Sequence, residues 1–267
     1  MIKFIRHIRR SLIQENKMGA STEASAKVGS YFKYAIGEIL LVVIGILIAL
    51  QINNWNAQSK TKGSAETQLS QLYQYVSDDL ILLGTLNNNT LTNLGSCERL
   101  SEQFQLIKPF DSLTTSHIID NLFERNFYTN TTAFDKLNQS GEFSILPKAL
   151  QSDIASYYYL LNRVKEREEI SNTFIKKDLE PYYFDSYSMY HRKGSNKHPI
   201  VSEYYKNDRR KPIPLDIEKI KNDNKMSTLI FARYYQLKNQ QLLYKEAIEK
   251  AQLIKNLIED YLNFTNV

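Results

Sequence analysis

The sequence predicts an all-α protein in which a single N-terminal transmembrane helix precedes a helical bundle. The first observation is an unbroken apolar run over residues 39–50, and the second is the spacing of three or four residues between apolar side chains after residue 64. A third is the small number of turn formers, nine glycines and six prolines, which argues against a turn-rich β-fold. The helical domain, with about 200 residues, is long enough to form its own core.

Residues 1–33 form a basic segment with seven Lys and Arg against two Glu, so the positive charge is local and no nucleic-acid partner is expected. Residues 1–13 alternate basic and apolar residues, which fits either an amphipathic helix on an anionic leaflet or a flank that only sets orientation. Gly19–Ser30 is small and polar and predicts a flexible linker. The positive-inside rule places residues 1–33 in the cytoplasm and the rest, beyond the anchor, in the periplasm.

Residues 34–55 are the predicted transmembrane helix, which at 22 residues matches the roughly 30 Å of a bilayer core. Tyr34 and Trp55 lie where aromatic side chains settle at the headgroups. The basic region is too long for a signal peptide, and no small-x-small cleavage site follows Leu50 closely. We therefore expect an uncleaved, single-pass anchor in the cell inner membrane.

One stripe of this helix carries polar and small residues at helical spacing, namely Glu38, Gly45, Ala49 and Asn56. Small residues four apart let a second helix approach closely, and polar ends can hydrogen-bond across the contact. The stripe predicts packing against another transmembrane helix, from a second copy or from a membrane-protein partner. In the alternative interpretation, Glu38 only reaches toward the cytoplasmic interface and the glycine is incidental.

A polar connector over residues 56–63 leads into the helical domain, residues 64–267. Its first apolar stripe is interrupted by the run Asn87–Thr90, which predicts a break with Thr90 as the N-cap of a second helix ending at Pro109. The single cysteine, Cys97, lies on that second stripe, which predicts a buried, inert thiol and excludes an internal disulfide. A shorter helix is expected after Ser116.

Residues 131–147 predict a compact turn between helices. Thr132 and Asp135 resemble a capping box, Gly141 suits a left-handed position after a helix end, and Pro147 suits the first turn of the next helix. The turn could bind a ligand. Local hydrogen bonding accounts for the same residues more simply.

Two long helices, Pro147 to about Glu180 and about Ser227 to Leu262, are expected to pack antiparallel as the spine of the bundle. Pro181 is expected to end the first. The basic loop between them, residues 185–214, interleaves tyrosines with cations, which fits either an anionic surface or an ordinary solvated loop. The basic surface there consists of Arg192, Lys193, Lys197, Arg209, Arg210 and Lys211.

No catalytic constellation is visible, so we expect neither an enzyme nor a bound cofactor. His191 and His198, with Glu203 nearby, are only a weak metal candidate because their spacing does not match a common ligand motif. The carboxylates of Asp78–Asp79 and Glu166–Glu169 are expected on exposed helix faces.

The anchor YAIGEILLVVIGILIALQINNWN, preceded by MIKFIRHIRR, resembles the membrane-anchored proteins of domain-of-unknown-function family 6090, found in Bacteroidota. The likeness covers residues 31–56, and FDKLNQSGEFSIL at 134–146 is similar to the family's Leu-x-x-Ser-Gly segment. The linker at 19–30 is longer than the family's usual join, and the loop at 185–214 lies outside the likeness. The resemblance implies topology and localisation but no catalytic residue. Asp111-Ser112-Leu113 also resembles the O-glycan acceptor of exported Bacteroidota proteins, which predicts a glycan at Ser112.

These observations favour a non-enzymatic inner-membrane protein whose periplasmic bundle binds a protein partner or an envelope component. The alternative is a periplasmic small-molecule sensor. A cytoplasmic tail of 33 residues is too short for an output domain of its own, which weighs against the sensor.

Overall fold

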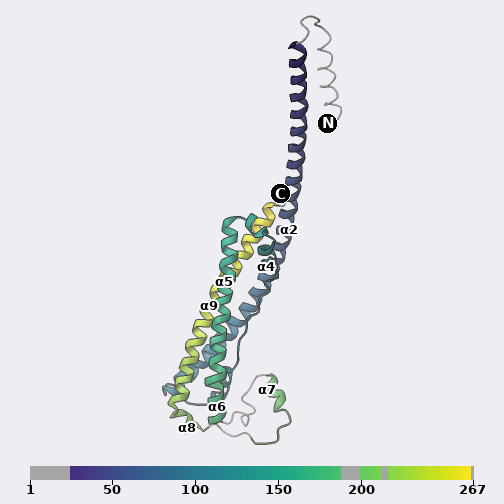
Figure 1. Ribbon diagram of the computed structural model, residues 1–267. Helices are drawn as coiled ribbons and strands as arrows, with labels where there is room; N and C mark the ends of the chain where they lie inside the picture. The colour runs from purple at the N-terminus through teal and green to yellow at the C-terminus, as the bar shows by residue number, and fades with distance from the viewer. Residues whose placement is uncertain (1–24, 188–198, 212–215, 266–267) are drawn as a thin grey trace. The chain divides into compact units, whose positions relative to one another are not determined.

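The computed structural model describes residues 25–187, 199–211 and 216–265, and every regular element within them is helical (Figure 1). The prediction of an all-α protein is confirmed for this part of the chain. By its contacts the chain divides into two units, Met1–Thr61 and Lys62–Val267, which are treated separately below.

The first long helix, α2, runs from Ser25 to Phe104 without interruption. Two predictions are therefore wrong: the linker expected to be flexible is helical from residue 25, and the run Asn87–Thr90 does not break the helix. The polar connector at 56–63 lies within the same helix. Thr90 is not a cap, because its hydroxyl donates to the Leu86 carbonyl oxygen at 2.8 Å inside the helix. Asn88 and Asn89 point to solvent, where an asparagine costs a helix little.

The end of α2 comes earlier than predicted, at Phe104 rather than at Pro109. Leu106 adopts a left-handed backbone conformation with φ of 59°, which ends the helical path. Ile107, which follows this residue, is 65% exposed.

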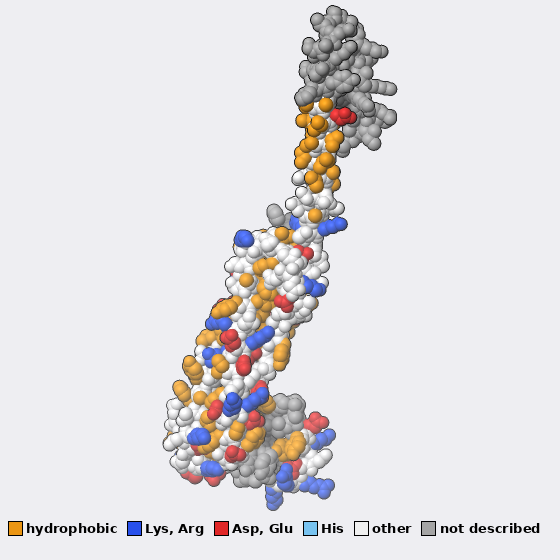
Figure 2. Space-filling model, in the orientation of Figure 1, with side chains coloured by type: hydrophobic (Ala, Val, Ile, Leu, Met, Phe, Trp, Pro, Cys, Tyr) orange, Lys and Arg blue, Asp and Glu red, His pale blue; other side chains and the backbone are white. Residues whose placement is uncertain are grey.

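In the first unit, every described side chain of α2 is exposed, from Ala35 to Lys60. Figure 2 shows hydrophobic side chains covering this part of the helix. Among the described residues, α2 is the one helix whose length and apolar composition fit a membrane crossing, and none of that apolar window is buried. The first unit thus contains a candidate membrane span over the predicted segment.

In the second unit, α5 (Lys148–Phe174) and α9 (Asn224–Thr265) lie side by side, and the part of α2 after Lys62 contributes to the same core (Figure 1). Asp153 is bonded to Lys250 at 2.5 Å, and Arg167 donates to Gln236 at 3.0 Å. Residue numbers along α9 thus decrease in the direction in which residue numbers along α5 increase.

The helical path does not end at Pro181, contrary to the prediction. A π-helical segment, η3 (Ile175–Leu179), follows α5 and leads into α6 (Glu180–Tyr187). In a regular α-helix a proline ring collides with the carbonyl group four residues earlier, here that of Lys177. Lys177 lies within η3, and a π-type turn is one of the known ways in which a helix accommodates such a distortion.

Short elements complete the second unit: α3 (Thr114–Asp120), α4 (Thr132–Gln139), η2 (Glu142–Ile145), α7 (Pro199–Tyr204) and α8 (Ile217–Lys221). Gly141, between α4 and η2, has φ of 76°, which confirms the predicted left-handed glycine. The predicted capping box at Thr132 does not form. Thr131 precedes α4 and makes no side-chain bond to the helix backbone, and its hydroxyl donates to the Asp135 carboxylate at 2.7 Å. Pro147 lies directly before α5.

Candidate functional site: a buried polar network

A coil segment, residues 121–131, lies between α3 and α4 and contains no helix or strand. Polar side chains from three helices hold its backbone and side chains: Asp79 of α2, Glu168 and Asn172 of α5, and Arg233 of α9. All four are buried. Together they form a buried polar network around this segment.

Arg233 is fully buried, with 0% of its surface exposed. Its Nε donates to the Asn121 carbonyl oxygen at 3.1 Å and its Nη2 to that of Phe123 at 3.3 Å, so two of its bonds fix the start of the coil segment. Its Nη1 donates to the Ser171 hydroxyl at 2.5 Å. Burial lowers the pKa of the guanidinium to about 10, which still leaves the side chain charged near neutral pH.

A chain of hydrogen bonds leads away from Arg233 and ends on Glu168. The Ser171 hydroxyl donates to Gln240 Oε1 at 3.4 Å, Gln240 Nε2 donates to the Tyr244 hydroxyl oxygen at 2.9 Å, and that hydroxyl donates to Glu168 at 2.5 Å. Every donor points toward the carboxylate. A buried cation and a buried carboxylate are thus joined through three neutral side chains, an arrangement in which neighbouring bonds polarise one another.

Glu168 also accepts the backbone N–H of Phe127 at 2.8 Å, so the same carboxylate fixes the middle of the coil segment. Further along, Asp79 accepts the hydroxyls of Thr129 at 2.7 Å and Tyr157 at 2.8 Å. Burial raises the pKa of both carboxyls, because the low-dielectric interior disfavours the charged form. Each carboxylate accepts two hydrogen bonds from other groups of the protein. These bonds hold the coil segment in place against the helices.

The prediction that these carboxylates are solvent-exposed is wrong for Asp79 and Glu168 and holds for Asp78, Glu166 and Glu169. The spacing of Asp79 and Glu168 relative to neighbouring apolar residues indicates that both side chains face the interior. Asp79 lies three residues after Val76 and four before Leu83, and Glu168 lies four after Val164, so both occupy positions on a buried stripe. Arg233 likewise lies between the buried Ile230 and Leu237 of α9.

The transmembrane stripe lies wholly on α2, and each of its members is exposed in the first unit: Glu38, Gly45, Ala49 and Asn56. A Cβ atom built on Gly45 meets nothing within 4 Å. Packing of this stripe against another helix stays a prediction.

The basic surface falls partly outside the described residues, which do not include Arg192, Lys193 and Lys197. Arg209, Arg210 and Lys211 are exposed. Arg210 is paired with Asp208 at 2.9 Å, two residues away, so local pairing already occupies one of these cations. Ser112 is exposed in the turn between α2 and α3, and its glycan stays a prediction.

The metal candidate His191 and His198 also lies outside the described residues, and no group of three potential ligands is found within them. Cys97 is buried, as predicted, and its thiol donates to Asn121 Oδ1 at 3.0 Å. Burial raises the pKa of this thiol to about 12, which keeps it protonated and unreactive.

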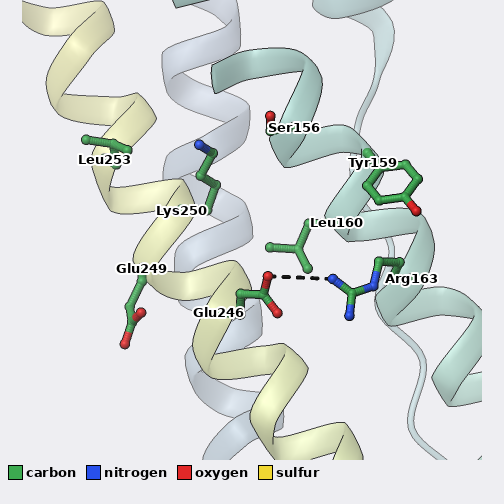
Figure 3. Close-up of a pocket in the computed structure, with 8 residues that line it drawn as sticks. All are labelled: Ser156, Tyr159, Leu160, Arg163, Glu246, Glu249, Lys250 and Leu253. Carbon is green, nitrogen blue, oxygen red and sulfur yellow. Dashed lines mark ion pairs between the residues drawn. The ribbon is translucent and has the colours of Figure 1, made fainter. Parts of the chain in front are cut away.

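An open groove of about 410 Å³ lies on the seam between α5 and α9 (Figure 3). Arg163 and Glu246 face each other across it at 3.6 Å, and Lys250 reaches Asp153 nearby. Tyr159 and Leu253 add apolar surface at its walls. The groove can hold a small molecule against a mixed lining, but it lies apart from the buried network, whose residues do not line it.

The model of the Family of unknown function (DUF6090) matches residues 38–178, more than half of the chain. The matched range contains the anchor from Glu38 onward and the turn at 134–146, but neither the basic loop nor α9. No curated protein and no solved structure matches the chain.

Proposed function

Because the chain belongs to the family of unknown function DUF6090, whose membership carries no activity with it, we propose a function from its surfaces. The protein is a single-pass inner-membrane protein with its N-terminus in the cytoplasm. Its periplasmic domain is a bundle with α5 and α9 as an antiparallel spine, and it binds a protein partner or an envelope component without catalysing a reaction. The opposite order of the contacts along α5 and α9 supports the antiparallel arrangement.

The observation that carries the proposal is a row of exposed apolar side chains on α9: Phe231 at 70%, Tyr235 at 58%, Leu242 at 56% and Leu253 at 44%. At about 100° per residue these four lie within roughly 40° of one another, so they share one face of the helix. Large exposed aromatic and aliphatic side chains that recur on one face are typical of surfaces that contact another molecule.

The absence of catalysis is supported by the buried network. Asp79 and Glu168 are the two described carboxylates with raised pKa values, which is a common mark of an active site. Both are bonded to the chain's own groups, and holding the coil segment accounts for their burial.

Affinity purification of the full-length protein from its native membrane tests the partner. The triple substitution Phe231→Ser, Tyr235→Ser and Leu242→Ser should abolish recovery of the partner that the natural sequence retains. A matched control replaces Ile81 and Leu91, which are exposed apolar residues on α2, by serine. Equal recovery with the triple variant and the control would contradict the proposal.

The orientation is tested separately, by fusing a reporter that is active only in the periplasm after Val267. The bias of seven basic residues to two acidic ones before the anchor leads us to expect a signal from the periplasm alone. A reporter active only in the cytoplasm would reverse the topology.

The groove between α5 and α9 favours a second candidate, a small-molecule sensor, because charged and aromatic side chains converge on a space of ligand size. A ligand that binds only the folded protein raises its melting temperature by mass action. Ligand-dependent melting that Tyr159→Ala abolishes, together with an unaffected partner recovery, would favour the sensor.

A further inference from the structure

The coil segment carries a second arginine whose hydrogen-bonding capacity the chain does not fill. Arg125 donates through Nη2 to Asn93 Oδ1 at 3.3 Å, which links the segment to α2. Its Nε is buried without a hydrogen-bond partner among the described residues, and so is Nδ2 of Asn93. Asn93 itself is only 3% exposed. Two buried N–H groups without acceptors are unusual, because burying a donor without a hydrogen bond destabilises the folded state.

The two unfilled donors lie on the same pair of planar groups. Nε and Nη2 are both bonded to Cζ of Arg125, and Nδ2 and Oδ1 are both bonded to Cγ of Asn93, while Nη2 and Oδ1 are 3.3 Å apart. Covalent geometry therefore keeps both free donors beside this one contact.

The surroundings of this contact are positively charged. Arg233 donates to the coil segment, to which Arg125 itself belongs. The charge of Arg125 disfavours that of Arg233, and burial lowers the pKa of each guanidinium. No carboxylate oxygen of the described residues lies within 4 Å of either guanidinium. Asp120 favours the charge of Arg125 only from a greater distance. Glu168 is connected to Arg233 only through the chain of hydrogen bonds that passes through Tyr244. Buried charges without a close counter-charge are costly.

We propose that Asn93 and Arg125, with Arg233 behind them, form a binding site for one small anion, of the size of chloride or a carboxylate group. The anion accepts hydrogen bonds from Arg125 Nε and Asn93 Nδ2 and supplies the counter-charge that the chain lacks at this point. Bound there, it links α2 to the coil segment and thereby stabilises the folded second unit. The site is independent of the partner surface on α9.

Thermal unfolding of the full-length protein in detergent micelles, followed by circular dichroism, tests the site. Sodium acetate and sodium chloride are each compared with sodium gluconate at constant ionic strength, since the long polyhydroxy chain attached to the gluconate carboxylate does not fit a buried contact that admits acetate. We expect acetate or chloride to raise the melting temperature, with about a hundredfold shift in the unfolding equilibrium at a hundred times the dissociation constant. Equal melting in all three salts would mean that water fills the two donors, and would overturn the proposal.

Asn93→Asp is the decisive variant because it keeps the acceptor for Arg125 Nη2 and places a fixed carboxylate where the anion is proposed. It should melt higher than the natural protein in gluconate and show no further rise with acetate or chloride. Asn88→Asp, an exposed asparagine on the same helix, is the matched control and should keep the anion dependence. An Asn93→Asp protein that remains anion-dependent, or that melts below the Asn88→Asp control in gluconate, would exclude the site.

Discussion

The two parts of α2 treat their side chains in opposite ways. Between Ala35 and Lys60 the helix exposes every side chain, including a long apolar run. After Lys62 the same helix buries not only leucines but also polar residues, among them Asp79, Asn93 and Gln103. In this helix, whether a side chain is buried therefore does not follow from whether it is polar or apolar. What surrounds each part decides which side chains are stable there, lipid in the proposed anchor and polar partners from α5, α9 and the coil segment in the domain.

The largest effect is expected where a buried charge depends on protein partners. Arg233→Ala removes three hydrogen bonds, two of them to the Asn121 and Phe123 carbonyl oxygens, and opens a cavity. The free energy of unfolding should fall by about 3–5 kcal/mol, measured by urea denaturation. Arg163→Ala, whose ion pair with Glu246 is exposed, should change it by less than about 1 kcal/mol. A similar decrease in the free energy of unfolding for the two variants would contradict a stabilising role of the buried network.

A second pair of variants distinguishes exposed residues that face lipid from exposed residues that face water. Leu47 is 59% exposed and Ile81 is 73% exposed, so the structure alone does not tell their surroundings apart. Leu47→Arg should weaken membrane insertion by about 3 kcal/mol, because a charge at the centre of a span is costly. Ile81→Arg, on a water-facing position, should leave insertion unchanged. Carbonate extraction measures both, and an equal response would argue that residues 34–55 do not span a membrane.

A smaller contrast lies within one dipeptide. Asp79→Ala leaves the hydroxyls of Thr129 and Tyr157 without their acceptor and should cost about 2 kcal/mol of folding stability, measured by denaturation. Asp78→Ala, at an exposed position, should stay within about 0.5 kcal/mol of the natural protein. Equal effects would show that Asp79 does not hold the coil segment.

The sequence was sufficient to predict an element where the local pattern of residues indicated one structure only. The apolar run of the anchor, the long helix α9 and the left-handed Gly141 follow from local pattern alone. The run Asn87–Thr90 predicts a break because its residues favour caps, but tertiary packing of Leu86 and Leu94 keeps the helix continuous. Pro181 predicts a helix end because the π-helical turn before it has no local sequence signature.

The buried network was beyond the sequence for a different reason. Polar residues on a buried stripe are stable only if partners arrive from distant segments, and the bond from Asp79 to Tyr157 spans 78 positions. Ser171 and Gln240 are 69 positions apart and belong to different helices. Local spacing marks Asp79 and Glu168 as inward-facing, but it does not name the hydroxyl or N–H that makes their burial tolerable.

The smallest expected effect concerns the stripe of Glu38, Gly45, Ala49 and Asn56 in the anchor. A Cβ atom at Gly45 meets nothing within 4 Å, so a larger side chain fits α2 itself without any clash. A substitution there can matter only through a second helix, whose close approach small residues permit. Gly45→Ile or Ala49→Ile should therefore weaken association in membranes by about 1 kcal/mol, seen as reduced crosslinking, while Val43→Ile, off the stripe, should not. Equal crosslinking in all three would mean that the helix only anchors the protein, and that Glu38 is solvated at the membrane boundary rather than bonded across a helix pair.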